Sequence, residues 1–270
     1  MAPGVAQRPD ASGAVAFAQM VYNTNMKEFI YGRNPVFETL RARRRDGFRL
    51  QIAEGIQEKG RLIQILDLAA ARNIPVERVT RARLDKLSES HQGVAVEVSS
   101  YPYVEMEDIL EKASLSREPL FVLVLDTLQN PQNLGTIIRT AEAVGVHGIL
   151  IPSHRAAEVT PAVVSASAGA TEHMLVAKVN LAQALADLKA NNTWVVGLDE
   201  GPESKPPSGI PMDGALVIVV GSEGEGIRPL VRQSCDFLLH LPMQGQVESL
   251  NAAVAGSVGL YLAYLARHKS

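Results

Sequence analysis

Cysteine is almost absent from this chain of 270 residues, in which Cys235 is the single one. A lone thiol excludes an intrachain disulfide and fits a reducing compartment. Long apolar runs are missing as well. The nearest candidate, residues 252–266, carries no charge but is too short to span a bilayer and is mostly Ala, Gly and Ser. We therefore expect a cytoplasmic protein with no membrane partner.

The two common nucleotide-binding patterns are also absent. The loop GSEGEG at 221–226 has its glycines in the order G-x-x-G-x-G, which matches neither G-x-G-x-x-G nor the P-loop pattern. The six histidines have neither metal-ligand spacing nor a G-x-S-x-G partner. The sequence thus disfavours a Rossmann dehydrogenase, a phosphate-binding P-loop and a triad hydrolase, and we expect no metal.

Positive charge is scarce overall, because the net formal charge is −3, but it is unevenly distributed. Residues 1–98 hold 15 Lys and Arg against 11 Asp and Glu, whereas residues 99–270 hold 11 against 18. A cluster of arginines lies in the first half, at Arg41, Arg43, Arg44, Arg45 and Arg49. This asymmetry indicates that one half meets a polyanion, although a merely solvated arginine-rich helix end would have the same composition.

The hydrophobic pattern predicts two α/β units. Residues 29–98 alternate short strands and helices, including a helix over 34–45 that starts with an Asn34 cap and Pro35. Residues 99–118 are expected to form a linker with one short helix, and residues 1–28 a disordered leader. In residues 119–270, continuous apolar runs such as FVLVL and LVIVV are typical of a parallel sheet covered on both faces.

Three loops of the second unit follow predicted strands, and ligands bind at the carboxyl ends of strands in open parallel sheets. These loops are 126–135, 221–226 and 241–251. The third concentrates hydrogen-bonding side chains before a helix expected to start around Leu250. Glycines in the second let the backbone approach an adenosine-like group. Simpler interpretations remain open for two residues. Ser249 can be a helix cap. Arg139 lies off the apolar stripe of its helix and can be an ordinary exposed arginine.

Taken together, the segments LDTLQNPQNLGTIIRTAEAVG, VIVVGSEGEGI and LPMQGQVESLNAAVA resemble the three motifs of the SpoU (TrmH-type) RNA 2′-O-ribose methyltransferases of the SPOUT superfamily. The segments YGRNPVFETLRA and HQGVAVEV resemble the small ribosomal-protein-like RNA-binding domain of the RlmB-like branch, which methylates a guanosine ribose of 23S rRNA. One residue departs from the pattern: Asn130 stands where the family often has Asp before the motif-one proline.

The resemblance implies a fold and a cofactor. It implies a parallel α/β sheet whose C-terminal part forms a trefoil knot, with the RNA-binding domain in front of it. It also implies that S-adenosylmethionine binds in the knot and that the protein is a homodimer. The matching motif positions expected to contact the cofactor are Gly221, Leu241, Met243, Gly245 and Leu250.

The resemblance also implies an active site and an RNA-binding surface. The polar residues that match the family's active site are Asn133, Arg139, Glu223, Ser249 and Asn251. We expect Arg139 to bind the target phosphate, because a guanidinium has no free acceptor and stays protonated. The residues expected to contact RNA are Arg33, Asn34, Arg41, Arg44, His91 and Gln92.

Three alternatives remain open from the sequence. The target nucleotide can instead lie in tRNA, although the first unit favours ribosomal RNA. It can be an antibiotic-resistance site in 23S rRNA, since the resistance enzymes carry a similar first unit. The chain can also be a non-catalytic rRNA-binding assembly factor, against which the five intact active-site residues argue.

Overall fold

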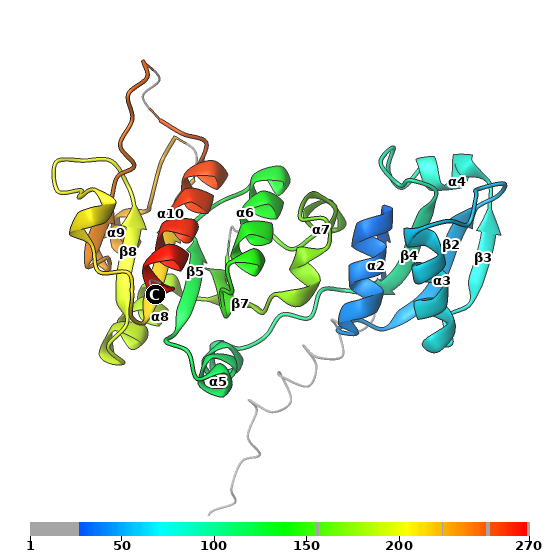
Figure 1. Cartoon of the computed structure of the whole chain (residues 1–270), viewed down its shortest axis with the longest axis horizontal. Coiled ribbons are helices and arrows are strands. Elements are labelled where there is room, and N and C mark those ends of the chain that lie inside the picture. Colours follow the sequence, from blue (N-terminus) through cyan, green and yellow to red (C-terminus); the bar gives the residue numbers. More distant parts are fainter. Residues whose placement is uncertain (1–26, 155–156, 223, 247–248, 269–270) are drawn as a thin grey trace, which may run out of the picture.

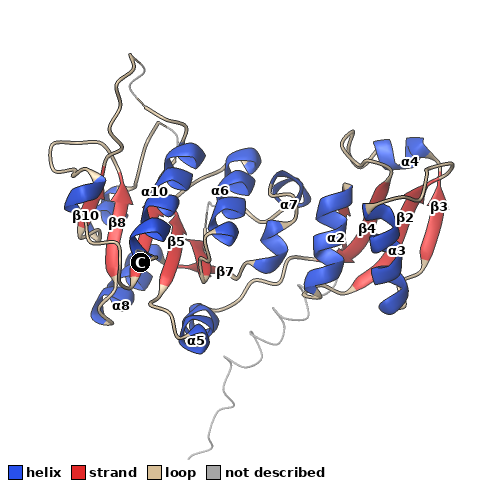
Figure 2. Cartoon of the chain, in the orientation of Figure 1, coloured by secondary structure: helices blue, strands red, loops and turns tan. Residues whose placement is uncertain are grey.

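A computed structural model of the chain describes residues 27–154, 157–222, 224–246 and 249–268. Two α/β domains lie along the long axis of the molecule, as Figure 1 shows by chain position and Figure 2 by secondary structure. The predicted α/β class is confirmed. Of the predicted leader, only Lys27 and Glu28 are described, and they open the first strand.

The N-terminal domain is built on a four-stranded sheet in the order β1-β4-β2-β3. Strand β4 pairs antiparallel with β1 and β2, whereas β2 and β3 are parallel. Apolar residues of α2 and α3 are buried in the core beside this sheet. Its elements are β1 (Lys27–Tyr31), α2 (Arg33–Ala42), β2 (Gly47–Ala53), α3 (Arg61–Ala71), β3 (Val76–Val79), α4 (Arg81–Asp85) and β4 (Val94–Ser99).

Helix α2 differs from the prediction at both ends. It begins at Arg33 after Gly32, so Asn34 is not its cap. It ends at Ala42 because Arg43 adopts the left-handed conformation, with φ 56°, which an α-helix cannot continue. The chain therefore leaves the helix before Arg45, and the arginine cluster is divided between a helix and a loop.

The C-terminal domain contains six parallel strands in the order β10-β8-β9-β5-β6-β7. The predicted parallel sheet is confirmed, and β5, β6 and β9 are buried along their whole length. Its elements are α5 (Met106–Ser116), β5 (Phe121–Leu125), α6 (Pro131–Ala143), β6 (Gly148–Pro152), α7 (Pro161–Ala166), η1 (Ala170–His173), β7 (Val176–Val179), α8 (Leu181–Ala190), β8 (Trp194–Leu198), η2 (Pro207–Gly209), β9 (Leu216–Val220), α9 (Pro229–Gln233), β10 (Phe237–Leu239) and α10 (Ala252–Arg267).

Helices cover both faces of the six-stranded sheet. One buried cluster joins the sheet to α6, α7 and α10, and a second joins it to α5, α8 and α9. The strand order reverses at the β5–β9 pair, because β6 and β7 continue to one side and β8 and β10 lie on the other. Ligands bind at such a reversal in open α/β sheets. The C-terminal trefoil knot stays a prediction.

Candidate active site

Three loops gather at the carboxyl edge of the C-terminal sheet. They follow β5, β9 and β10, and β9 hydrogen-bonds to both β5 and β8, the neighbour of β10. A fourth segment joins them, because Asp199 and Glu200 follow β8 directly and line the same cavity as Gly221. The sequence analysis selected only the loops 126–135, 221–226 and 241–251, so this fourth segment was not among them. The strand-end rule applied to β8 would have selected Asp199.

A buried carboxylate ties the first loop to the second. Asp126 is fully buried at the end of β5 and accepts hydrogen bonds from the Arg228 backbone N–H at 2.8 Å and from its Nε at 2.7 Å. The Nη2 of Arg228 also lies 2.7 Å from Asp126 Oδ1. The next residue, Thr127, has φ 64°, a strained conformation for a β-branched residue. Asp126 and Arg228 therefore hold the two loops in one arrangement.

Gly221 is required by the shape of the second loop. The N–H of Ser222 donates to the carbonyl of Gly226 at 3.0 Å, and the N–H of Gly226 donates back at 3.2 Å. This turn brings the Gly226 backbone so close that any side chain at Gly221 would overlap it. Close backbone approach, expected from the glycine-rich sequence, thus exists here. Glu223, one of the predicted active-site residues, lies outside the described residues.

A cavity of about 510 Å³ lies between these loops. Four of the five predicted cofactor residues, Gly221, Leu241, Met243 and Leu250, line it, whereas Gly245 is exposed and does not. Its other side chains and backbone come from Leu198, Asp199, Glu200, Val220, Ser222, Gly224, Gly226, Leu239, His240, Ser249, Asn251, Ala252 and Ala255. The wall therefore combines apolar side chains with carboxylates and small polar groups.

Two polar side chains at the cavity, Asp199 and His240, have protein partners. Asp199 accepts from Nε of Arg232 at 2.6 Å, so one carboxylate of the lining is paired with a cation behind it. The Nδ1 of His240 lies 3.1 Å from the hydroxyl of Ser204. These contacts orient the two side chains before any ligand is bound.

The structure brings two predicted active-site residues together from distant parts of the chain. Asn251 caps α10, because its Oδ1 accepts from the N–H groups of Ala253 at 3.0 Å and Val254 at 3.2 Å. Its Nδ2 donates to Oδ1 of Asn133 on α6 at 3.2 Å. Asn251, and not Ser249, is thus the cap, and α10 begins two residues later than predicted. Ser249 lines the cavity.

Arg139 lies apart from this pair. It is exposed on α6 and does not line the cavity. Among the described residues, its guanidinium has no hydrogen-bond or ion-pair partner. Within these ranges the guanidinium is exposed and accessible to an anion from outside the molecule.

In the N-terminal domain, two predicted RNA contacts share a second cavity of about 560 Å³. The N–H of Arg33 donates to Oε1 of Gln92 at 3.0 Å, and Gln92 has a positive φ of 52°. Arg81, the first residue of α4, lines the same cavity and was not among the predicted RNA contacts. The remaining lining residues are Ala53, Glu54, Gly55, Ile56 and Gly93.

Two other predicted RNA contacts have structural partners instead. His91 is buried, its Nδ1 accepts from the N–H of Gly93 at 2.8 Å, and its Nε2 lies 2.9 Å from Asp85 Oδ1. Arg44 donates to the carbonyls of Met174 and Pro102 and to the hydroxyl of Tyr101. His91 has no donor left for a phosphate, and Arg44 keeps only its Nε–H and one Nη2 N–H, so neither is carried into the proposed set of RNA contacts.

The last two predicted RNA contacts, Asn34 and Arg41, are exposed on α2. The Nε of Arg41 lies 2.9 Å from Oε2 of Glu38, one turn away on the same helix. This exposed ion pair is weak and leaves the other guanidinium nitrogens accessible.

Comparison with known families agrees with this geometry. The model of the SpoU rRNA methylase family matches residues 120–261, which contain the large sheet and its cavity. The model for RNA 2′-O ribose methyltransferase substrate binding matches residues 29–104. Two matches in this order cover both domains.

Curated relatives agree with the family match, and a solved structure has the same fold. A protein of Bacillus subtilis (strain 168), YacO, which is named as a TrmH family tRNA/rRNA methyltransferase, is 43% identical over 245 residues, covering 89% of this chain and 96% of that relative. A similarly named protein of Staphylococcus aureus (strain COL) is 41% identical over 222 residues, covering 82% and 89%. The crystal structure of the SpoU methyltransferase AviRb from Streptomyces viridochromogenes with AdoMet superimposes with a TM-score of 0.73 at 23% identity, covering 92% of each chain.

The two domains and their matches define the class of protein: an RNA 2′-O-ribose methyltransferase with a separate substrate-binding domain. The chain belongs to the SpoU rRNA methylase family. The predicted membership is thereby confirmed. No helix within the described ranges is long and apolar enough to cross a membrane.

Proposed function

We propose that the protein methylates the 2′-hydroxyl of a guanosine ribose in 23S rRNA. The observation that carries this proposal is the cavity at the carboxyl edge of the sheet, which Asn251 lines and which the Asn133–Asn251 pair therefore borders. A cofactor site and a set of hydrogen-bonding side chains thus meet at one place. The N-terminal domain favours ribosomal RNA as the substrate.

The residues of the cavity fit S-adenosylmethionine. Its volume of about 510 Å³ lies in the range of small-molecule sites. The side chains of Leu198, Val220 and Leu250 supply apolar surface for the adenine, and the backbone of the 221–226 loop supplies hydrogen-bonding groups. The carboxylates of Asp199 and Glu200 suit ribose hydroxyls and positive charge. We propose Gly221, Leu241, Met243 and Leu250 as cofactor contacts, and keep Gly245 as an accessory contact of the same loop.

S-adenosylmethionine supplies a methyl group bound to a positively charged sulfur. The task of the protein is to hold the ribose hydroxyl in line with that group, and positioning alone lowers such barriers substantially. Asn251 is suited to this because its cap and its bond to Asn133 fix the amide. Ser249 adds a hydroxyl at the cavity wall.

Arg139 binds the phosphate beside the target ribose in this proposal. Its guanidinium stays protonated and has no acceptor, so it is not the base. Its positive charge instead lowers the pKa of the hydroxyl, and the proton leaves to a phosphate oxygen, a water or a carboxylate. Glu223 orients Arg139 or the ribose.

The RNA is held by the N-terminal domain through Arg33, Asn34, Arg41 and Gln92, with Arg81 added from the shared cavity. Two guanidinium groups at one cavity suit the phosphates of a single nucleotide step. The variants Arg33→Ala and Arg81→Ala should each weaken rRNA binding several-fold and reduce its salt dependence by about one counterion. Arg83→Ala, which removes an exposed arginine paired with Glu77, is the matched control.

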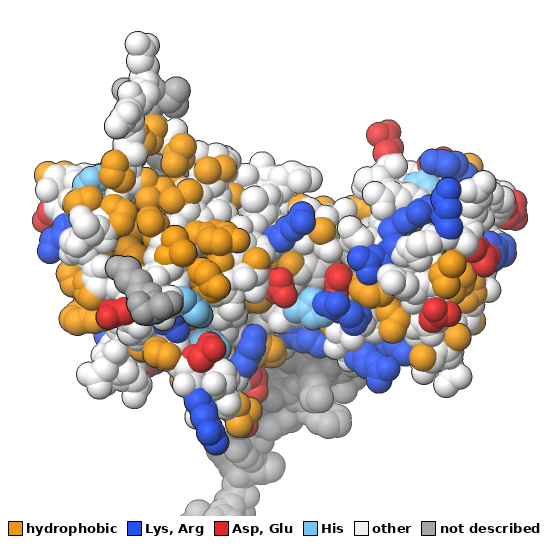
Figure 3. Space-filling model, viewed as in Figure 1, with side chains coloured by type: hydrophobic (Ala, Val, Ile, Leu, Met, Phe, Trp, Pro, Cys, Tyr) orange, Lys and Arg blue, Asp and Glu red, His pale blue; other side chains and the backbone are white. Residues whose placement is uncertain are grey.

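The proposal includes a cytoplasmic homodimer. Apolar residues gather on the outer face of α10, and Figure 3 shows apolar side chains over this part of the molecule. Val254, Val258, Tyr261 and Leu265 recur at helical spacing and are 40–58% exposed. A face of this kind is typical of a protein–protein interface.

The first experiment incubates the full chain with radiolabelled S-adenosylmethionine and either unmodified 23S rRNA or tRNA, and then maps the label. We expect label on one guanosine ribose of 23S rRNA. Label only on tRNA would overturn the assigned substrate, and label on a nucleotide that confers antibiotic resistance would assign a resistance enzyme. A protein that binds rRNA and cofactor without transfer, on free rRNA and on assembling particles, would be a non-catalytic factor.

The second experiment tests Arg139. Arg139→Ala should lower the single-turnover rate on bound RNA at least a hundredfold, because no other group replaces the phosphate contact. Arg117→Ala, which removes another exposed arginine at the end of α5, should leave the rate unchanged. A near-normal rate for Arg139→Ala would refute the role proposed for this residue.

A further inference from the structure

The contact between the two domains contains a fully buried ion pair. The side chains of Arg45, from the loop after α2, and Glu172, from η1, are both 0% exposed. They form a two-point contact, in which Nε of Arg45 donates to Oε2 of Glu172 at 3.0 Å and Nη2 donates to Oε1 at 2.9 Å. The Nη1 of Arg45 also donates to Oε2 of Glu28 at 2.7 Å and to the Ser99 carbonyl at 3.3 Å.

Directional hydrogen bonds surround this pair. Arg44 donates to the Met174 and Pro102 carbonyls, and the hydroxyl of Tyr101 lies 2.6 Å from the same Met174 carbonyl. His173 Nε2 lies 2.8 Å from Oε2 of Glu38 on α2. We call this set, Glu38, Arg44, Arg45, Tyr101, Glu172 and His173, the joint.

Close packing accompanies the polar contacts. A side-chain carbon at Gly169 would lie 2.6 Å from Cβ of Glu38, so the backbone before η1 touches α2 directly. Buried apolar residues of β1 and α2 belong to the same continuous cluster as those of α6 and α7. The contact therefore excludes water and has little freedom to slide.

The joint connects directly to both proposed RNA-binding regions. On one side, Arg45 follows α2, whose first residue, Arg33, lines the N-terminal cavity. On the other side, α7 and η1, which carries Glu172, pack against α6. Helix α6 carries both Asn133 and Arg139. A change at the joint therefore moves one RNA contact relative to the other.

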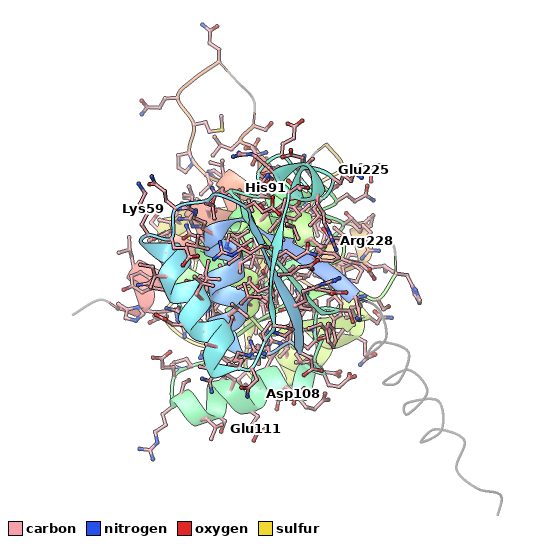
Figure 4. All side chains as sticks on the ribbon, turned by 90° about the vertical axis from the view of Figure 1, so that its right-hand side faces the viewer. Lys59, His91, Asp108, Glu111, Glu225 and Arg228 are labelled. Carbon is pink, nitrogen blue, oxygen red and sulfur yellow. The ribbon has the colours of Figure 1, made fainter. Side chains whose placement is uncertain are left out.

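Residues next to the two cavities lie toward the same long edge of the molecule. In Figure 4, Lys59 and His91 of the N-terminal domain and Glu225 of the 221–226 loop all lie in the upper half, whereas Asp108 and Glu111 of α5 lie at the bottom. His91 precedes Gln92, which lines the N-terminal cavity, and Glu225 lies between two residues that line the other cavity. One RNA can therefore lie along this edge and meet both.

We infer that Arg45 and Glu172 are positioning residues that fix the distance between the RNA contacts of the two domains. The enzyme then selects as its target the ribose that lies at this distance from the RNA element bound by the N-terminal domain. This inference rests on the proposed function. A partial separation of the domains would leave the Glu172 carboxylate without its arginine and Arg45 with Glu28 as its remaining ion-pair partner, which disfavours intermediate arrangements. A rigid spacing converts RNA binding at one domain into correct placement at the other.

The test compares Glu172→Gln with Glu97→Gln. Both changes remove a buried carboxylate that is paired with arginine, but Glu97 contacts Arg49 and Lys27 inside the N-terminal sheet. Each protein is assayed on the rRNA identified by the labelling experiment and on a short hairpin around the same ribose that does not reach the N-terminal domain. Small-angle scattering measures the spacing of the domains in each variant.

We expect Glu172→Gln to lower kcat/KM at least tenfold on the long RNA, to leave the rate on the hairpin within twofold, and to broaden the scattering distance distribution. Glu97→Gln should change none of these quantities. A residue that only stabilises the fold would lower the melting temperature without changing the ratio of the two rates. Equal rate ratios and equal scattering for Glu172→Gln and the parent protein would overturn the inference.

A second variant and a second measurement keep the inference testable if the first experiment fails. If Glu172→Gln does not fold, Tyr101→Phe removes only one hydroxyl from the joint and should shift the rate ratio in the same direction. If no RNA is methylated by the parent protein, the proposed function fails, whereas scattering still decides whether the joint holds the domains at one spacing.

Discussion

At the scale of single residues, Asn251 has two roles, as the cap of a helix and as a member of the proposed active site. Its Oδ1 caps α10, and its Nδ2 contacts Asn133. Asn251→Ala should lower the free energy of unfolding by about 1 kcal/mol through loss of the cap. It should also reduce methyl transfer at least tenfold.

Asn180→Ala is the control for this change. Asn180 caps α8 on the opposite face of the sheet, so its loss should cost a similar stability and leave activity intact. Denaturant unfolding and single-turnover assays of the two variants separate the effects. Equal activities in the two variants would remove Asn251 from the catalytic set.

His147 makes stability depend on pH. Burial lowers the pKa of this histidine, and the positive charge of Lys112 acts in the same direction. Its Nδ1 accepts from the Phe121 N–H at 3.0 Å, so protonation breaks a bond at the start of β5. The unfolded chain therefore binds the proton more readily. The contribution of His147 is complete above the unfolded pKa of about 6.5 and is lost as pH falls below it.

His147→Gln should flatten this dependence, since an amide oxygen can accept the same bond without titrating. Unfolding free energies of the two proteins at pH 7.5 and pH 5.5 measure the effect. The parent protein should lose more stability on acidification than the variant. An identical loss in both would show that His147 stays neutral or is protonated equally in the folded and unfolded states.

At the scale of elements, the contact of α10 with α6 brings the third motif to the first. Gly256 lies on α10, where a side-chain carbon would overlap Ile137 Cδ1 and come within 3.1 Å of Val220. Gly256→Ala should therefore force the helices apart and cost about 1–3 kcal/mol of unfolding free energy, despite the better helix propensity of alanine.

Gly259→Ala tests the same helix at a position where the neighbouring side chains pack less closely. Its new carbon would meet only the flexible end of Leu198, at 3.2 Å. We expect a change in unfolding free energy smaller than about 1 kcal/mol. If Gly256→Ala were equally tolerated, the close α6–α10 contact would not control the position of Asn251.

At the scale of the whole molecule, the apolar face of α10 predicts the oligomeric state. Tyr261→Asp places a charge in the middle of this face and should convert a dimer to a monomer in sedimentation. Leu115→Asp, an equally drastic change at a more exposed residue of α5, should leave the dimer intact. A monomeric parent protein would contradict the proposed homodimer.

Much of the architecture follows from local patterns. The strands β5 and β9 are continuous apolar runs, because both faces of a parallel sheet are buried, and this property is visible in five adjacent residues. The three motif loops were selected because they follow such strands. The same rule missed Asp199 only because the segment after β8 is rich in turn-forming residues.

The helix ends were predicted less well. Asn34 and Ser249 both have the chemistry of a cap, but Gly32 and Asn251 hold that position. Several nearby residues can cap a helix, and packing of the whole helix decides among them.

The sequence by itself determined the two α/β domains, the parallel sheet, the family and the loops that hold the site, because these depend on hydrophobic period and on motifs of neighbouring residues. Only the tertiary structure decided which arginines are free. Arg44 and Arg45 read like Arg41 in the sequence, yet they are buried or bonded at the joint, and the partner of Arg45 is Glu172, 127 positions away. The role of a long charged side chain depends on what packs against it, and that partner is set by folding.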